Sequence, residues 1–269
     1  MALLCAGPFC MINVENISFA YPVAEGQPKF ILHNVSLHIH AGESIVVMGH
    51  NGSGKTTFAR CLNGLLIPTS GHVTVDGIDT SDQKSIVNLR RLVGMVFQNP
   101  DNQIVSTTVE REIAFGLENL GVAYEDMHAI VDDMLQKFNL SQYRKHPPHL
   151  LSGGEKQRLA IAAVMAMSPH YLVLDEPTSL LDPANRQMIL NITKSLHDAT
   201  TKDKPITTIL ITQFPEEALF ANRLLIFNQG QVAMDGEPRA LFERTEQLEK
   251  IGLEPPLELK VRAMLKKHI

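Results

Sequence analysis

Residues 151–157 of this chain read Leu151-Ser152-Gly153-Gly154-Glu155-Lys156-Gln157, and they are the strongest indication of its fold. Its small residues predict a helix start that exposes backbone N–H groups, and the Ser152 hydroxyl adds a donor. Such a start can bind an anion, although a simple helix cap is the alternative. The stretch is informative because of its position in the chain. A glycine-rich loop precedes it and an acidic strand end follows it.

The glycine-rich loop begins at Gly49 and leads into a predicted helix over 55–65. Its glycines permit a tight turn that aims successive N–H groups at phosphate oxygens, and the helix N-terminus adds partial positive charge. Lys55 is suited to neutralise the β- and γ-phosphates of a nucleotide, and the Thr56 hydroxyl to ligate Mg²⁺. A buried strand over 44–48 precedes the loop, as this motif requires. We assign nucleotide contacts to Gly49, Asn51, Gly52, Ser53, Gly54, Lys55, Thr56 and Thr57.

The acidic strand end is Asp175-Glu176, which follows an apolar strand predicted over 171–174. One carboxylate there can hold Mg²⁺ directly or through water, while its neighbour acts as general base on the attacking water. We assign Asp175 to the metal and Glu176 to the base. A solvated acidic strand end is the alternative, and the phosphate loop upstream argues against it.

Composition excludes several classes of protein. The 269 residues are 44% hydrophobic with a net charge of −5, which predicts a globular protein without strong attraction to nucleic acid. No apolar run approaches the roughly 18 residues of a membrane-spanning helix. If the chain serves a transporter, the membrane path therefore lies in other chains. Cys5, Cys10 and Cys61 lack metal-site spacing and indicate a reducing cytoplasm, and Cys61 is expected to pack in a helix.

Strand-like and helix-like runs alternate along the chain, which predicts an α/β fold. From 98 to 166 the strand signal fades, and helical spacing over 107–120 and 125–138 predicts an inserted helical subdomain. Beyond 235 the chain is charged and helical, with a last helix expected over 257–267. The expected strands cover 12–19, 35–39, 44–48, 72–75, 93–97, 171–174, 207–211 and 224–227.

The three stretches in this order resemble the nucleotide-binding subunit of an ATP-binding cassette (ABC) transporter over nearly the whole chain. The resemblance implies a P-loop NTPase fold: a RecA-like core with an antiparallel β subdomain, an inserted helical subdomain and a C-terminal helical extension. It divides the chain into a tail (1–10), an ATPase domain (11–234) and an extension that helps dimerisation (235–269). ATP and Mg²⁺ are the implied cofactors, and hydrolysis to ADP and phosphate is the implied reaction.

In this family two subunits pack head to tail, so that residues 151–157 of one subunit, the signature, cap the γ-phosphate on the other's phosphate loop. Leu181-Asp182 matches the loop that contacts the opposite subunit. Tyr21 matches the aromatic residue that stacks on adenine, worth about 1–3 kcal/mol by analogy with base–aromatic contacts. Alone, it would be an ordinary strand-end aromatic. The signature residues assigned to the nucleotide are Ser152, Gly153, Gly154 and Gln157.

Two glutamines join Glu176 as implied catalytic residues. Gln98 follows the strand predicted over 93–97 and matches the glutamine that reaches Mg²⁺ and the attacking water. Gln213 stands where the family usually has a histidine that contacts the γ-phosphate. A glutamine amide can donate a hydrogen bond but can neither carry charge nor shuttle a proton. We therefore expect the site built on this chain to turn over more slowly than one with histidine.

The segment after Gln98 narrows the subtype. Residues 99–105 and 108–119 resemble the ATPases of energy-coupling factor (ECF) transporters, which import vitamins and transition-metal ions. In that family this segment lines a groove for a coupling helix whose arginines meet acidic residues. Glu110 and Glu112 are the candidates, because opposite charge favours docking. Arg111 between them is less usual, and an acidic solvated helix face is the alternative.

The resemblance also implies three partners: a second ABC ATPase, an ECF transmembrane scaffold and a membrane substrate-binding subunit. Gln213 beside an intact signature fits a heterodimer with unequal sites. The implied location is peripheral, at the cytoplasmic face of the cell membrane. The nearest alternative is the ATPase subunit of another ABC transporter class. ABC proteins that act on ribosomes or DNA usually have two cassettes or basic arms, whereas this chain has one cassette and no basic run. The presence of Glu176 disfavours a regulatory module without hydrolysis.

Overall fold

The computed structural model describes residues 11–22, 28–198 and 206–266, so the expected tail at 1–10 lies outside the described residues. Two sheets organise this part of the chain, with strand orders β2-β1-β4-β5 and β10-β9-β3-β8-β7-β6. The first sheet is antiparallel, and the second is parallel except for β10. The strands are β1 (Met11–Tyr21), β2 (Lys29–His40), β3 (Ser44–Gly49), β4 (Ser70–Val75), β5 (Ile78–Asp79), β6 (Val93–Val96), β7 (Tyr171–Asp175), β8 (Thr207–Ile211), β9 (Arg223–Asn228) and β10 (Gln231–Gly236).

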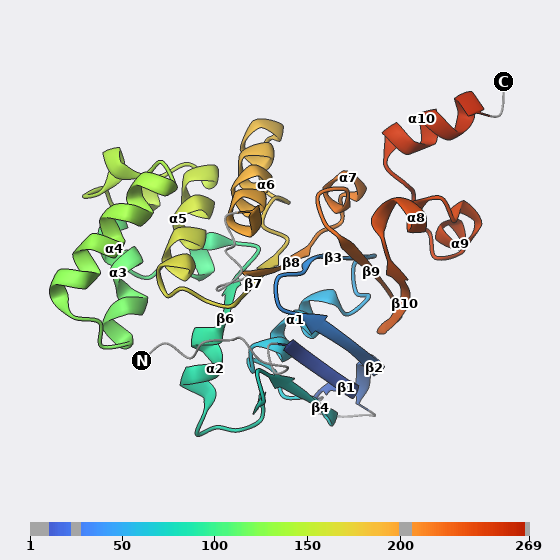
Figure 1. Cartoon of the computed structure of the whole chain (residues 1–269), viewed down its shortest axis with the longest axis horizontal. Helices are drawn as coiled ribbons and strands as arrows, with labels where there is room; N and C mark the ends of the chain where they lie inside the picture. The colour runs from blue at the N-terminus through green and yellow to red at the C-terminus, as the bar shows by residue number, and fades with distance from the viewer. Residues whose placement is uncertain (1–10, 23–27, 199–205, 267–269) are drawn as a thin grey trace.

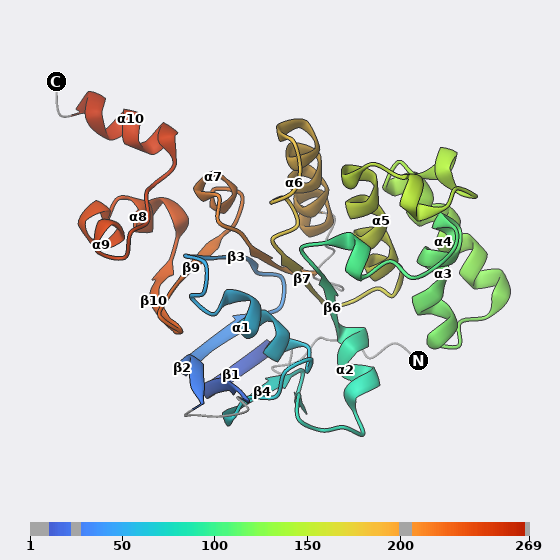
Figure 2. The same ribbon diagram turned by 180° about the vertical axis from the view of Figure 1, so that it is seen from behind.

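Helices cover both sides of the six-stranded sheet, and Figures 1 and 2 show them from opposite directions. α3, α4 and α5 form a block between β6 and β7 in sequence. α8, α9 and α10 form the C-terminal part at the other side of the molecule. The helices are α1 (Lys55–Leu62), α2 (Ile86–Leu92), α3 (Val109–Asn119), α4 (Tyr124–Lys137), α5 (Gly153–Ala166), α6 (Pro183–Asp198), α7 (Pro215–Ala218), α8 (Pro238–Phe242), α9 (Thr245–Lys250) and α10 (Leu257–Lys266).

The six-stranded sheet separates two apolar clusters, because alternate side chains of a strand point to opposite faces. Val46 and Met48 of β3 belong to the helix-side cluster, which also contains residues of α3 to α6. Ile45 and Val47 of the same strand belong to the β-side cluster, together with residues of α1 and the four-stranded sheet. β7, β8 and β9 divide their side chains in the same way. Cys61 of α1 is fully buried in the β-side cluster, as expected.

The register of the sheet gathers the functional segments at one edge. Within the parallel part, β3 pairs with β8 and β9, and β7 pairs with β6 and β8. The carboxyl ends of these strands therefore meet at the same edge, which is where ligands bind in open α/β sheets. The phosphate loop follows β3, Gln98 follows β6, Glu176 follows β7 and Gln213 follows β8.

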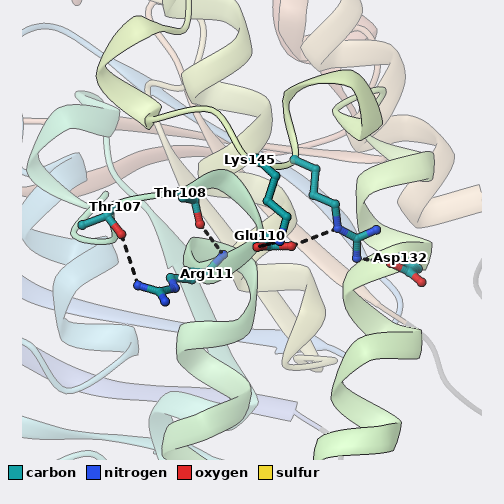
Figure 3. A network of polar contacts seen from close by, with 7 residues as sticks. Thr107, Thr108, Glu110, Arg111, Asp132 and Lys145 are labelled. Carbon is teal, nitrogen blue, oxygen red and sulfur yellow. Dashed lines mark hydrogen bonds and ion pairs between the residues drawn. The ribbon is translucent and has the colours of Figure 1, made fainter.

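A polar network joins the helices of the inserted block (Figure 3). Arg144 donates to Glu110 of α3 over 2.9 Å and also to Asp132 of α4. Lys145 donates to the other oxygen of Glu110 over 2.5 Å. The start of α3 is capped by Thr108, whose hydroxyl oxygen accepts from the backbone of the first turn. The block is thus held by ion pairs at its surface as well as by the helix-side cluster beneath.

The C-terminal helices pack against the helix-side cluster and contact the phosphate loop. Leu241, Phe242 and Leu248 are buried in the helix-side cluster. The imidazole Nε2 of His50, within the phosphate loop, lies 2.8 Å from the carbonyl oxygen of Ile251. The end of α9 is therefore attached directly to the loop expected to bind phosphate.

The structure contains a last strand, β10, that is not among the strands expected from the sequence. β10 continues to Gly236, whereas the sequence interpretation ended the main domain at 234 and expected helix from 235 onward. Gln231 pairs with Asn228, so β9 and β10 are joined by the two-residue turn Gln229-Gly230. Both turn residues have positive φ, 46° and 76°, as a type I′ hairpin turn requires. A turn-forming glycine between two apolar runs was the available signal for this hairpin.

Candidate nucleotide site

The backbone of the phosphate loop passes too close to its neighbours for side chains at two glycines. A Cβ added at Gly49 would lie 2.3 Å from the Phe227 carbonyl oxygen and 2.6 Å from Ser53 Oγ. A Cβ at Gly54, which has a φ of 102° and caps α1, would lie 2.8 Å from Leu32. Only glycine fits both positions, so the loop keeps its tight turn at the start of α1.

The cationic side of the site is Lys55. Its ammonium group is buried and donates to the carbonyl oxygens of Gly49 (2.7 Å) and His50 (2.9 Å). Burial lowers the pKa of Lys55, while Glu176 and Asp175 act against this shift by favouring the charged form. The loop thus contains a positive charge held at a fixed place beside two carboxyl groups.

The acidic side of the site is the pair at the end of β7. Thr56 Oγ1 donates to Asp175 Oδ1 over 2.9 Å, which brings together two of the three side chains assigned to the metal. Burial raises the pKa of Asp175, and burial also raises the pKa of Glu176. Glu176 has a φ of 49°, a left-handed conformation that is uncommon for a side chain of this size.

Gln98 is brought to the same place from β6. Its Nε2 donates to Glu176 Oε2 over 3.2 Å and to Ser179 Oγ over 3.2 Å. The Ser179 hydroxyl in turn donates to the Glu176 carbonyl oxygen over 3.0 Å. Gln98 therefore orients the carboxylate that is the candidate general base.

These residues fit a nucleoside triphosphate with a divalent cation. Ser53 Oγ is buried and has no hydrogen-bond partner among the described residues, so the loop retains a donor for an oxygen ligand. A Cβ at Gly52, by contrast, would meet nothing within 4 Å, so this part of the loop is open. The Thr56 hydroxyl and the Asp175 carboxyl group can bind a metal ion, and the buried Lys55 ammonium can neutralise phosphate charge. A metal–phosphate ligand requires groups of these two kinds.

Tyr21 and Gln213 lie at the borders of this site. Tyr21 ends β1, is 39% exposed, and its hydroxyl is 3.4 Å from Thr57 Oγ1 at the start of α1. Phe19 supports the Tyr21 ring edge-on at a centroid distance of 4.9 Å. Gln213 is exposed just after β8, the strand between β3 and β7. Tyr21 and Gln213 thus both keep exposed surface at positions flanking the phosphate loop.

The signature forms the first turn of α5. Ser152 is its N-cap and forms a capping box with Glu155: the Ser152 backbone N–H and hydroxyl each donate to Glu155 Oε2 over 2.7 Å. A Cβ at Gly153 would make only an ordinary contact, 3.9 Å from Leu181 Cδ2, whereas a Cβ at Gly154 would lie 2.3 Å from Asn185 Oδ1. Both views place α5 away from α1, so one chain does not bring its signature to its own phosphate loop (Figures 1 and 2).

Gln157 differs from the rest of the signature. Its side chain points into the protein, it is 1% exposed, and its Nε2 has no partner among the described residues. Its side chain thus lies in the interior of this single chain, and its assignment as a nucleotide contact stays a prediction. One helical turn places Gln157 on the buried face of α5, whereas the cap residues remain at its exposed end.

The acidic candidates for the coupling groove are engaged within the chain. Glu112 is 5% exposed and its Oε2 accepts from the backbone N–H groups of Val105 (3.0 Å) and Ser106 (2.8 Å). Glu110 carries the ion pairs with Lys145 and Arg144, which lower the pKa of its carboxyl group (Figure 3). The expectation that both carboxylates face a partner's arginines is corrected, because Glu112 serves as a buried support for the 105–106 turn.

The fold and the site together define the class of this protein. A phosphate loop and an acidic pair at one edge of a parallel sheet form a nucleoside triphosphatase site, and the inserted helical block with its glycine-rich helix start is the mark of an ATP-binding cassette. The family model described as ABC transporter matches residues 32–179. Among the residues that the structure describes, no helix combines the length and apolarity needed to cross a membrane.

Known relatives are similar along almost the entire chain. The energy-coupling factor transporter ATP-binding protein EcfA1 of Clostridium novyi is 46% identical over 246 residues, 91% of this chain and 86% of that protein. The protein of the same name from Caldanaerobacter subterraneus is 43% identical over 258 residues, 96% of this chain and 92% of that protein. The chain therefore belongs to the energy-coupling factor transporter ATP-binding proteins of the ABC transporter family.

Solved structures agree with this assignment. The structure of cbiO1 from Clostridium perfringens, part of the ABC transporter complex cbiONQ, has a TM-score of 0.77 at 31% identity and covers 94% of this chain and 98% of its own. The dimeric cassette MJ0796 bound to ADP and Pi has a TM-score of 0.75 at 28% identity, with coverages of 84% and 98%. The α/β cassette fold and the enzymatic class of ABC ATPase are thus confirmed.

Proposed function

We propose that this chain hydrolyses ATP as one of two cassettes that drive an energy-coupling factor importer of vitamins or other micronutrients. The proposal rests on one observation: the two halves of the nucleotide site lie far apart on the same chain. Lys55, Asp175 and Glu176 form one half, and the exposed start of α5 at Ser152 forms the other half at a distant place on the same chain. Two chains packed head to tail would complete both sites.

Each residue has a distinct task in this proposal. The phosphate loop and Lys55 bind and orient the β- and γ-phosphates, and Tyr21 stacks on the adenine ring. Thr56, Asp175 and Gln98 would hold Mg²⁺, which supplies neutralisation of phosphate charge during transfer. Glu176 accepts the proton of the attacking water, and its raised pKa, caused by burial, suits this role. Gln213 donates a hydrogen bond to the γ-phosphate.

We base the proposed partners on the relatives and on the separation of the two half-sites along the chain. A second ATPase supplies the opposite signature, and the unusual Gln213 supports a partner of different sequence. The extension at 235–269 helps to hold the two ATPases together, and Ile251 attaches it to His50 of the phosphate loop. A transmembrane scaffold and a membrane substrate-binding subunit complete the importer, which places this chain at the cytoplasmic face of the membrane.

The test uses the complex assembled in cells. The chain is co-expressed with the genes beside it, purified in mild detergent, and its bound subunits are identified by mass spectrometry. Glu176→Gln should lower ATPase activity by about 100-fold or more while ATP binding is retained, because it removes only the proton acceptor. Glu125→Gln, an exposed change on α4, is the matched control. Normal hydrolysis by Glu176→Gln, or recovery of ribosomes in place of membrane subunits, would refute the proposal.

A further inference from the structure

A buried carboxylate outside the described site joins two of its segments. Glu217 lies on α7, and its side chain is 2% exposed. Its Oε1 accepts a hydrogen bond from the Thr178 hydroxyl over 2.7 Å. Thr178, also fully buried, lies two residues after the candidate base Glu176, in the loop that follows β7. Glu217 therefore contacts the loop of the general base from a different element.

The same carboxylate is linked to the segment that carries Gln213. Arg186 of α6 places its Nε 3.9 Å from Glu217 Oε1. The Arg186 guanidinium lies over the ring of Phe214, 3.6 Å from its centroid. Phe214 directly follows Gln213, and its backbone N–H donates to Thr212 Oγ1 over 3.0 Å, which closes a tight turn around Gln213.

The sheet does not hold these two segments together beyond the ends of its strands. β7 and β8 are paired as far as Asp175 and Ile211, and the last backbone contact runs from Glu176 N–H to the Ile211 carbonyl oxygen over 3.0 Å. The Glu217 carboxylate bridges the two loops past this point. A carboxyl group is costly to bury without partners, and burial raises the pKa of Glu217 against the lowering effect of Thr212 and Thr178. An apolar side chain would fill the space at less cost, but it could not bridge.

We propose that Glu217 is a positioning residue for ATP hydrolysis. It fixes the loop of Glu176 through Thr178, and it fixes the segment of Gln213 through Arg186 and Phe214. The two catalytic side chains thereby keep a constant spacing on either side of the γ-phosphate. This inference rests on the proposed function, because it assigns Glu217 to the same site.

Steady-state ATPase kinetics of the purified complex provide the first test. Glu217→Ala should lower kcat by about tenfold or more, the loss expected when a hydrogen bond to a charged group is removed. The KM for ATP should change less than about twofold, because the phosphate loop is untouched. Glu217→Gln, which keeps an acceptor for Thr178, should recover part of kcat and protects the test against misfolding. Glu216→Gln, an exposed neighbour on α7, is the matched control.

A double-variant cycle separates positioning from general stability. Thr178→Val should lower kcat on its own, and Glu217→Ala combined with Thr178→Val should lower it no further than the worse single variant. If the kcat losses of the two single variants multiply in the double variant, the proposal is overturned. A KM that rises by the same factor as kcat falls would also overturn it. An unchanged kcat in a folded Glu217→Ala complex would also overturn it.

Hydrogen exchange distinguishes failure of this inference from failure of the proposed function. Glu217→Ala should accelerate exchange of backbone amides in both 176–182 and 212–217, whereas Glu216→Gln should not. If the complex hydrolyses no ATP but both segments exchange faster, the proposed function fails and the bridge stands. If ATP hydrolysis is normal and neither segment changes, the bridge fails and the proposed function stands.

Discussion

Gly94 in β6 offers a direct test of how tightly the inserted block packs on the sheet. A Cβ at this position would lie 2.4 Å from Val164 Cγ1 of α5 and 3.2 Å from the Pro169 ring. Gly94→Ala therefore forces strand and helix apart by about 1 Å to restore an ordinary contact. Overpacking of this kind costs about 1–3 kcal/mol. For a chain of about this size, 2 kcal/mol corresponds to a fall in Tm of about 4–8 °C.

The close approach of Gly94 to Val164 predicts a specific rescue. Val164→Ala alone should cost about 2 kcal/mol, because it removes two buried methyl groups. In the Gly94→Ala background the new methyl group occupies that space, so the two changes should be coupled by about 1–2 kcal/mol. Thermal unfolding of the four proteins measures this coupling. ATPase activity should follow the same pattern, since β6 leads directly to Gln98. Additive losses, or a Gly94→Ala protein as stable as the parent, would refute the packing argument.

Three other changes test separate features. Glu110→Gln should lower the free energy of unfolding at pH 7 by about 1 kcal/mol or less. Lys145 and Arg144 lower the pKa of Glu110 in the folded state, so its contribution is present above the ordinary value of about 4.3 and is lost as pH falls through the folded value. Cys61 should resist iodoacetamide in the native protein, because burial raises the pKa of its thiol to about 12. Gln213→His in the assembled complex should raise the ATPase rate, because an imidazole can carry charge beside the γ-phosphate.

Each of these measurements has its own control. Glu118→Gln, exposed on the same helix as Glu110, should leave the pH dependence of unfolding unchanged, and a Glu110→Gln difference that persists at pH 2 would contradict the ion-pair explanation. Peptide mapping in denaturant should show Cys61 fully alkylated, and rapid native labelling would contradict its burial. For Gln213→His, equal ATPase rates in the two complexes would show that this position does not limit turnover.

The nucleotide site could be anticipated because its parts are local in sequence. The phosphate loop, the strand before Asp175 and the helix start at Ser152 each follow from a few consecutive residues, and strand order then brings Gln98 to Glu176. Residues whose role depends on tertiary neighbours were misjudged. Glu112 looked like a surface acid at a helix start, but its carboxylate supports a backbone turn seven residues earlier.

Other elements could not be read from periodicity alone. β10 is half exposed and follows a two-residue turn, so its short run lacks the continuous apolar character of the buried strands. α6 begins with Pro183 and was not expected, because its buried residues, Ile189, Leu190 and Thr193, cover only a narrow stripe. Glu217 could not be identified for a related reason, because one of two adjacent acids in a four-residue helix forms no pattern until the fold surrounds it.

The division of side chains along β3, β7 and β8 limits how the molecule can move. Each of these strands is anchored on both faces, by the helix-side cluster and by the β-side cluster. Sliding one strand would disturb two close-packed layers at once. The phosphate loop, the acidic pair and Gln213 all leave from the ends of these strands, so they share one rigid origin. In the proposed pairing of two cassettes, we therefore expect the site to open and close by a relative rotation of whole layers, with the half-site on this sheet keeping its internal distances.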